Sequence, residues 1–174
     1  MQKKSIIGYV GVISPWFFDF ELVAKIAFKF QSSEIHLYGP CVNSVKNKLD
    51  KLLKLKNVSY FGEKSYFELP QIINNFKVGI IPLISKEEVW RLASGKFLQY
   101  LAVGTPVVSV WMEQYSNFNE NVFLSKSHKQ FLASIKIAEE HNFISIEKEL
   151  SKYDWNLLSK EFRSEIKDTI ESIK

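Results

Sequence analysis

Short apolar runs of strand length alternate with segments of helical periodicity along most of this chain. The strand-like runs are rich in Val, Ile and aromatic residues, and most of them end near Gly or Pro. Between them, apolar residues recur at three- and four-residue spacing, as in helices that bury one face. Strands joined through helices lie parallel, and such a sheet needs helices on both faces. The alternation therefore predicts a doubly wound, Rossmann-like α/β domain.

The expected elements follow from this pattern. Strands are predicted over residues 5–10, 34–38, 57–61, 77–82, 107–108 and 122–124. Helices are predicted over 20–30, 46–56, 65–75 and from Lys96 to Gly104. A strand–helix core is expected over about 5–125 and a helical tail over 126–174, with breaks near Asn142 and Asp154. The whole chain, 1–174, is expected to form a single domain because no linker or repeat divides it.

Composition fits a globular protein of a reducing compartment. The chain has 174 residues, of which 46% are hydrophobic and 24% are charged, both ordinary values. Cys41 is the only cysteine, so no internal disulfide is expected. No apolar run approaches the roughly 20 residues that span a bilayer. The first residues lead straight into a strand-like run, which leaves no room for a signal peptide. We therefore expect a cytoplasmic protein.

Positive charge gathers on the stretch 46–56. Val45, Leu49 and Leu52 fall on one helical face there, and the lysines fall largely on the other. A solvated helix surface is favoured, although peripheral contact with an anionic membrane at its inner face stays open. The net charge of +4 also permits attraction to phosphates. No recognition-helix, zinc-finger or aromatic RNA-binding motif occurs, so no nucleic-acid partner is expected.

The run 94–108 predicts a helix whose first residues can bind a phosphate, followed by a buried strand. Leu98 and Leu101 mark its apolar face. Gly104 is placed to end the helix in a left-handed conformation, and Pro106 then prevents the helix from continuing. The helix start contains Ser94, Gly95 and Lys96. Their backbone amides and the lysine ammonium group can bind a ligand phosphate there.

Several turn residues fall where predicted strands end. They are Gly11, Gly39, Gly62 and Pro82. In an open parallel sheet the carboxyl ends of the strands meet at one edge, and ligands bind beyond that edge. The sequence therefore predicts a ligand site there.

Six segments stand in an order that carries a family resemblance. They are 8–11, 37–40, 57–62, 66–70, 78–82 and 96–108, followed by Tyr153, Asp154 and Trp155. Together they resemble the C-terminal, donor-binding domain of GT-B glycosyltransferases, especially the family-four bacterial sugar transferases. The resemblance implies one half of a GT-B fold. It also implies transfer of a sugar from a nucleotide-diphosphate donor to a glycan or lipid-linked acceptor, as in bacterial cell-surface polysaccharide biosynthesis.

The same resemblance implies partners and residue roles. An N-terminal acceptor-binding domain or subunit would complete the enzyme, and a nucleotide sugar would be its substrate. No metal or other cofactor is implied, and no catalytic residue is assigned. Diphosphate contacts are implied for Gly11, Ser14, Ser94, Gly95 and Lys96. Nucleoside contacts are implied for Gly62, Glu63, Lys64 and Gln99.

Two positions depart from the family pattern. Many relatives carry two glutamates eight positions apart, where this chain has Arg91 and Gln99. Gln99 can still hydrogen-bond a ribose hydroxyl, but it carries no charge. Arg91 could meet a phosphate, or Glu87 or Glu88 could face the donor sugar. Three interpretations stay open: a donor-binding half with little activity alone, a non-catalytic nucleotide- or protein-binding module, and half of a sugar-nucleotide epimerase.

Other catalytic arrangements find little support in the sequence. His36 falls in a predicted buried strand, which favours a packed core histidine. His128 and His141 lie on the helical tail without metal-ligand spacing. The aromatic run that begins at Trp16 is typical either of a patch facing a partner or acceptor, or of core packing at a helix start.

Overall fold

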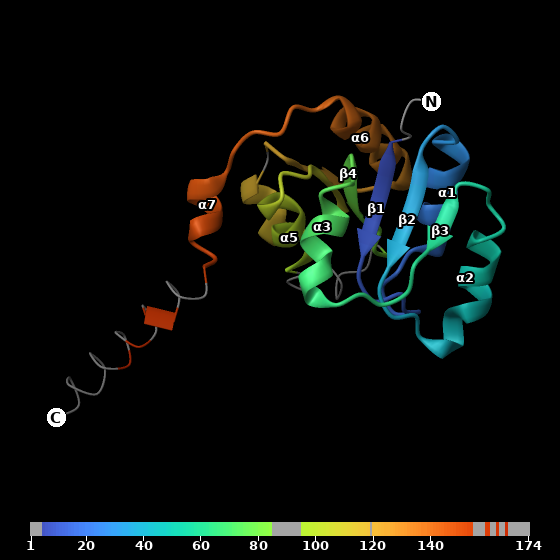
Figure 1. The fold of residues 1–174 in the computed structure, drawn as a ribbon. Coiled ribbons are helices and arrows are strands. Elements are labelled where there is room, and N and C mark those ends of the chain that lie inside the picture. The colour runs from blue at the N-terminus through green and yellow to red at the C-terminus, as the bar shows by residue number, and fades with distance from the viewer. Residues whose placement is uncertain are drawn as a thin grey trace. The chain divides into compact units, whose positions relative to one another are not determined.

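A computed structural model of the chain describes residues 5–84, 95–118, 120–154, 159, 160, 163 and 166. It contains two compact units, Met1–Ile144 and Ser145–Lys174. The first unit holds a six-stranded sheet in the order β3-β2-β1-β4-β5-β6, and every strand pair is parallel (Figure 1). The strands are β1 (Ile6–Val10), β2 (Glu34–Tyr38), β3 (Val58–Tyr60), β4 (Val78–Ile81), β5 (Val107–Val110) and β6 (Val122–Ser125).

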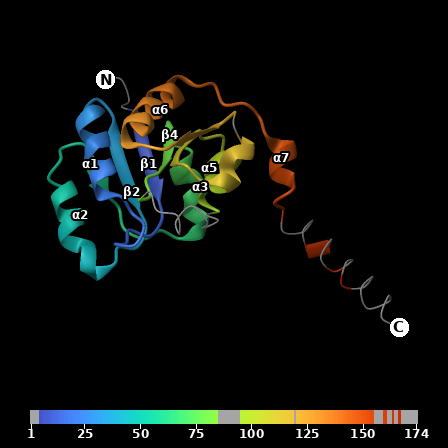
Figure 2. The same ribbon diagram turned by 180° about the vertical axis from the view of Figure 1, so that it is seen from behind.

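Helices cover both faces of this sheet (Figures 1 and 2). One face carries α1 (Phe20–Lys29), α2 (Lys46–Leu52) and α6 (His128–Glu140). The other carries α3 (Leu69–Ile73) and α5 (Lys96–Ala102). Short 3-10 turns are η1 (Asn43–Val45), η2 (Tyr66–Glu68) and η3 (Glu113–Phe118). The second unit contains α7 (Glu147–Ser151). This arrangement confirms the predicted doubly wound, Rossmann-like sheet.

The core lies between the sheet and its helices. Strands β4 and β5 are buried along their whole length, as expected for central strands of a sheet covered on both faces. Strand β2 alternates instead, with Ile35 and Leu37 fully buried and their neighbours partly exposed. Helix α1 faces the core with Leu22, Val23 and Ile26, which are also fully buried. The pattern of apolar residues thus determines which side of each element faces the core.

All six predicted strands are present, with bounds that differ by at most two residues.

The predicted end of α5 is also confirmed, because Gly104 has a φ of +77°. The amide of Gly104 donates to the carbonyl of Leu101 at 3.0 Å, and the amide of Thr105 donates to that of Tyr100 at 3.0 Å. These two bonds satisfy carbonyls that the last helical turn leaves unpaired.

The single helix expected over 65–75 is wrong in part. The structure has the 3-10 turn η2 followed by the short helix α3. The Glu68 carboxylate accepts a hydrogen bond from the Ser65 amide at 2.9 Å, which fixes the start of the turn. Pro70 has no amide hydrogen, so it fits only the first turn of α3. The two short pieces therefore form where one longer helix would need an amide at Pro70.

Two further features concern the helices. The predicted break near Asn142 agrees with the non-helical segment 141–146 between α6 and α7. Among the helices of the described residues, none combines the length and the apolar character that a membrane span requires.

Candidate functional site

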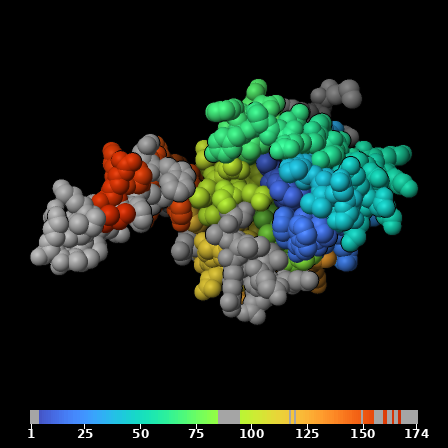
Figure 3. Space-filling view, turned by 90° about the horizontal axis from the view of Figure 1, so that it is seen from below, coloured from blue at the N-terminus to red at the C-terminus, as the bar shows by residue number. Residues whose placement is uncertain are grey.

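A cavity of about 290 Å³ opens at the carboxyl edge of the sheet. Figure 3 looks onto this edge, where the blue, cyan, green and yellow-green segments meet. Four separate stretches of the chain supply the lining, namely the ends of β1 and β2, the segment after β3, and helix α5. The lining residues are Val10, Gly11, Val12, Tyr38, Gly39, Pro40, Glu63, Lys64, Leu69, Lys96 and Gln99. The cavity therefore lies where parallel sheets bind their ligands.

The first three strand ends are joined by backbone hydrogen bonds. The Gly11 amide donates to the Tyr38 carbonyl, and the Gly39 amide donates to the Gly62 carbonyl, both at 2.8 Å. Gly39 has a φ of +124°, and a Cβ there would lie 2.2 Å from the Gly11 carbonyl oxygen. No side chain fits at that distance. Glycine at position 39 thus allows two strand ends to approach each other at the cavity wall.

Two buried tyrosines hold the strand end at residues 10–12. The Tyr9 hydroxyl donates to the Val12 carbonyl at 2.8 Å. The Tyr100 hydroxyl accepts from the Val10 amide at 2.8 Å. Both rings are fully buried, and burial raises the pKa of each phenol, so both stay protonated at neutral pH. The cavity wall is therefore positioned by neutral hydroxyl groups from the core.

Lys96 is the first residue of α5 and extends along this wall. A Cβ at Gly11 would lie only 2.2 Å from the Cε of Lys96, so a side chain at position 11 would collide with the lysine. Burial lowers the pKa of the Lys96 ammonium, because partial removal of water disfavours its charged form. An anion in the cavity would reverse that effect. Gln99, one turn later on the same helix, brings its amide to the same cavity.

An aromatic residue also belongs to the lining of the cavity. Tyr38 lines the cavity, and its ring stacks on Phe61 with centroids 4.8 Å apart and planes 14° from parallel. Partial burial raises the pKa of the Tyr38 phenol. Glu63, Lys64 and Leu69 are part of the same lining. A flat apolar ring beside polar groups suits a ligand that carries an aromatic ring and hydroxyls.

The structure brings five of the predicted site residues together around the cavity: Gly11, Glu63, Lys64, Lys96 and Gln99. Three other predicted residues that the structure describes, Ser14, Gly62 and Gly95, are not among those that line the cavity. Ser14 is fully buried, and its hydroxyl has no hydrogen-bond partner within the described part of the chain. Gly62 contributes its carbonyl to the bond with Gly39, and Gly95 is exposed just before α5. Glu87, Glu88, Arg91 and Ser94 lie outside the described residues.

Sequence reasoning did not assign roles to Tyr9, Tyr38 and Tyr100. Each lies in a segment that carries the family resemblance, but the resemblance assigns none of them a ligand contact. Tyr38 offered one usable signal, because it stands directly before the glycine that ends a strand at the expected ligand edge.

His36 proved to be mostly buried, with its Nε2 3.0 Å from a Glu34 carboxylate oxygen and its ring against Phe61. Trp16 is 69% exposed, whereas Phe18 is in the core.

A second polar cluster lies at the start of α1. His128 Nε2 is 2.8 Å from Asp19 Oδ2, and Asp19 Oδ1 accepts the Leu22 amide at 2.8 Å. The other ring nitrogen, Nδ1, is 3.1 Å from Lys25 Nζ. This cluster joins α1 to α6. Across the residues that the structure describes, no group of three or more His, Cys, Asp or Glu side chains could hold a metal ion.

Comparison with solved structures identifies the fold. Sucrose-phosphate synthase from Thermosynechococcus elongatus aligns with a TM-score of 0.80 and 11% identity, over 98% of this chain and 46% of that chain. Anabaena HepE in complex with UDP aligns with a TM-score of 0.65 and 15% identity, over 79% of this chain and 39% of that chain. The chain has the fold of one half of a GT-B glycosyltransferase. The predicted GT-B half-fold is confirmed.

A sequence comparison points in the same direction. The chain is 23% identical over 166 residues to the Bacillus subtilis (strain 168) protein named "Putative teichuronic acid biosynthesis glycosyltransferase TuaH". The match covers 90% of this chain but only 42% of that protein. The GT-B half-fold described here thus spans less than half the length of this curated relative. No protein-family model matches the chain.

Proposed function

We propose that this chain binds the nucleotide-diphosphate sugar donor of a glycosyltransferase, and that a separate N-terminal domain or subunit binds the acceptor. The observation that carries the proposal is the cavity at the carboxyl edge, where Gly11, Lys96 and Gln99 meet. Two comparisons support the proposal. The chain is similar in sequence to TuaH, and it shares its fold with HepE, whose structure was solved with UDP. We place the protein in the cytoplasm, in keeping with its single cysteine.

In this proposal the diphosphate lies against Gly11 and Lys96. Glycine allows the phosphates to approach the backbone, and the lysine supplies a compact positive charge in a partly desolvated site. As the sugar leaves, negative charge grows on the nucleoside diphosphate, and the ammonium group stabilises it. Further phosphate contacts are proposed for Ser94 and Gly95, whereas Ser14 is fully buried and receives no such role.

The nucleoside would occupy the other end of the cavity. Tyr38 offers its ring beside the base, and polar groups come from Glu63 and Lys64, which line the cavity, with Gly62 directly before them. The Gln99 amide is proposed to bind a ribose hydroxyl as an uncharged donor and acceptor. Arg91 and Glu88 are proposed for the donor sugar or its phosphates. The transferred sugar would pass to a glycan or lipid-linked acceptor.

Calorimetric titration with UDP, GDP and ADP tests donor binding. We expect one of the three to bind, weakly because only half of a two-domain site is present. Lys96→Met is expected to lower that affinity about tenfold, since it removes a charged hydrogen bond. Lys136→Met, an exposed position on α6, serves as the matched control and should leave affinity unchanged. Failure of all three nucleotides to bind would overturn the proposal.

The uncharged Gln99 favours a second candidate, a nucleotide-binding module that does not catalyse transfer. The two candidates differ once an acceptor-binding partner is present. A donor half should then transfer sugar from its nucleotide donor, although the chain alone transfers little. Nucleotide binding without transfer by the complete protein would favour the module. Efficient turnover by the isolated chain would contradict the two-part arrangement.

A further inference from the structure

The positive charge of the protein is concentrated in one segment. Residues 20–57 contain seven lysines and three acidic residues. Seven less three is +4, which equals the formal net charge of the whole chain. The remaining residues are therefore neutral in sum, and the segment that forms α1, β2 and α2 carries the excess.

This excess charge faces solvent on one side of the sheet. All seven lysines are exposed: Lys25, Lys29, Lys46, Lys48, Lys51, Lys54 and Lys56. Helices α1 and α2 lie side by side on that side (Figure 2). Of the three acidic residues, Glu34 belongs to β2 and pairs with His36 on the opposite face of the sheet. Glu21 is paired with Lys25 at 2.6 Å, so of the acidic residues within 20–57 only Asp50 is left to offset the other lysines.

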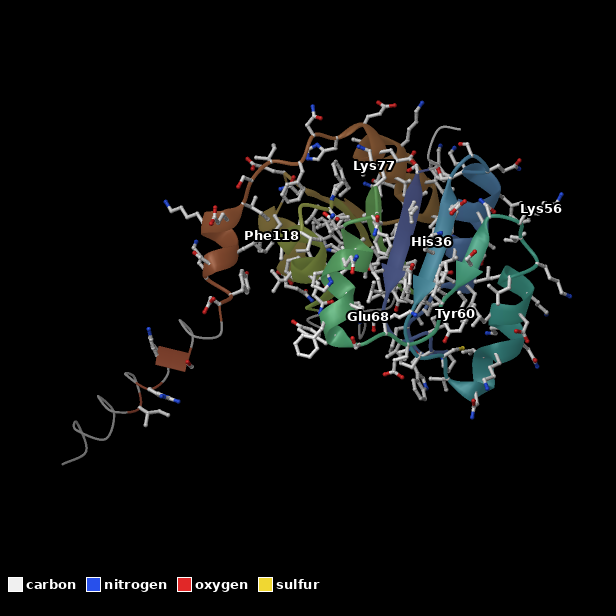
Figure 4. All side chains as sticks on the ribbon, in the orientation of Figure 1. His36, Lys56, Tyr60, Glu68, Lys77 and Phe118 are labelled. Carbon is white, nitrogen blue, oxygen red and sulfur yellow. The ribbon has the colours of Figure 1, made fainter. Side chains whose placement is uncertain are left out.

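Two large apolar side chains lie exposed among these lysines. Phe28 on α1 is 63% exposed, and Leu53 after α2 is 38% exposed. The Asn57 side chain, in the segment between α2 and β3, holds the end of α1, because its amide donates to the carbonyls of Ala27 and Phe30, both at 3.1 Å. Figure 4 shows Lys56 at this end, directed away from the sheet. We call the seven lysines with Phe28 and Leu53 the α1–α2 surface.

We propose that the α1–α2 surface binds an anionic phospholipid bilayer. Lysines attract anionic headgroups, and each one near such a surface strengthens binding roughly fivefold. Exposed apolar side chains among lysines enter the boundary between headgroups and acyl chains. Lysine charge alone would suit any polyanion. The exposed Phe28 and Leu53 distinguish a bilayer, because neither side chain gains from a purely ionic partner.

Sedimentation with lipid vesicles tests this surface. We expect the chain to bind vesicles of phosphatidylglycerol and phosphatidylcholine but not vesicles of phosphatidylcholine alone. Added salt should release the chain from the anionic vesicles, because it screens the charges. A triple variant, Lys51→Glu with Lys54→Glu and Lys56→Glu, should lower the partition coefficient at least about tenfold. Its matched control makes the same charge change at Lys77, Lys148 and Lys152, which are also exposed, and should retain most of the binding.

A second pair of variants tests the apolar contribution. Phe28→Ser should lower the partition coefficient severalfold, whereas Phe28→Trp should keep or raise it. Phe28 is exposed, so both variants should fold, and circular dichroism verifies this. The proposal is overturned if anionic vesicles are not bound, if the two triple variants lose binding equally, or if RNA is bound and vesicles are not. Nucleotide titration of the same variants separates this result from the proposed donor site.

Discussion

Among the individual residues, two tyrosine hydroxyl groups position the cavity wall. Tyr9 and Tyr100 bond the carbonyl of Val12 and the amide of Val10, on either side of Gly11. Buried backbone groups need such partners, because an unpaired amide in the core is costly. The hydroxyls thus link core packing directly to the shape of the cavity.

Tyr100→Phe tests this link. The variant keeps the ring but leaves the Val10 amide without its acceptor, so we expect the free energy of unfolding to fall by about 1–3 kcal/mol. Nucleotide affinity should fall as well, because the strand end at Gly11 loses its anchor. Denaturant unfolding and calorimetry measure the two effects. Tyr66→Phe, at an exposed ring, is the control and should change stability by less than about 0.5 kcal/mol.

Gly39→Ala tests the close approach of two strand ends. The added Cβ would lie 2.2 Å from the Gly11 carbonyl oxygen, so we expect strong destabilisation and loss of nucleotide binding. Gly62→Ala is a matched control, because its φ of +69° is also left-handed but nothing lies within 4 Å of the added atom. It should cost only about 1–2 kcal/mol. Equal losses in the two variants would contradict a steric role for Gly39.

The lowered pKa of Lys96 predicts a pH dependence of binding. Because Lys96 is partly buried, it loses its proton at a lower pH than the ordinary value of 10.5, and only the charged form attracts a diphosphate. Affinity should therefore be full near neutral pH and fall as pH rises through the lowered pKa of Lys96. Calorimetry from about pH 7 to about pH 10 measures this fall. Lys96→Met should remove the dependence, and an unchanged alkaline fall in that variant would assign it to another group.

At the scale of elements, Asp19 holds the start of α1 and contacts α6. One carboxylate oxygen accepts the Leu22 amide, and the other is 2.8 Å from His128 Nε2. Asp19→Ala should lower the free energy of unfolding by about 1–2 kcal/mol, through loss of the helix cap. Asp19→Asn retains a capping oxygen and should cost less. Thermal unfolding compares the variants, and equal losses would show that the His128 contact dominates.

The elements were largely predictable from sequence, whereas the cavity wall was only partly so. Strand ends and the end of α5 followed from local signals, since Gly104 and Pro106 restrict the backbone near themselves. Lys96 and Gln99 were found because they stand in a recognisable segment. The role of Tyr100 was missed, because Val10 and Tyr100 are 90 residues apart. Such a hydrogen bond depends on the packed sheet and leaves no local pattern.

At the scale of the whole molecule, the cavity and the α1–α2 surface are separate features of the first unit. The cavity lies at the carboxyl edge and the lysines cover a face. We expect the two to be occupied independently, so a saturating nucleotide should change the vesicle partition coefficient by less than about twofold. Sedimentation with and without UDP measures this. A larger change would indicate that the bilayer reaches the cavity or that nucleotide binding alters α1 and α2.

The hydrogen bond between Val10 and Tyr100 also has a consequence for protein engineering. It joins β1 to α5, so an α5 taken from a relative without a tyrosine at this position would leave the Val10 amide unpaired. Chimeras between related domains are often made by replacing one contiguous piece of chain. In this fold, hybrids that take β1 and α5 from the same parent should express as folded protein more often than hybrids that divide them.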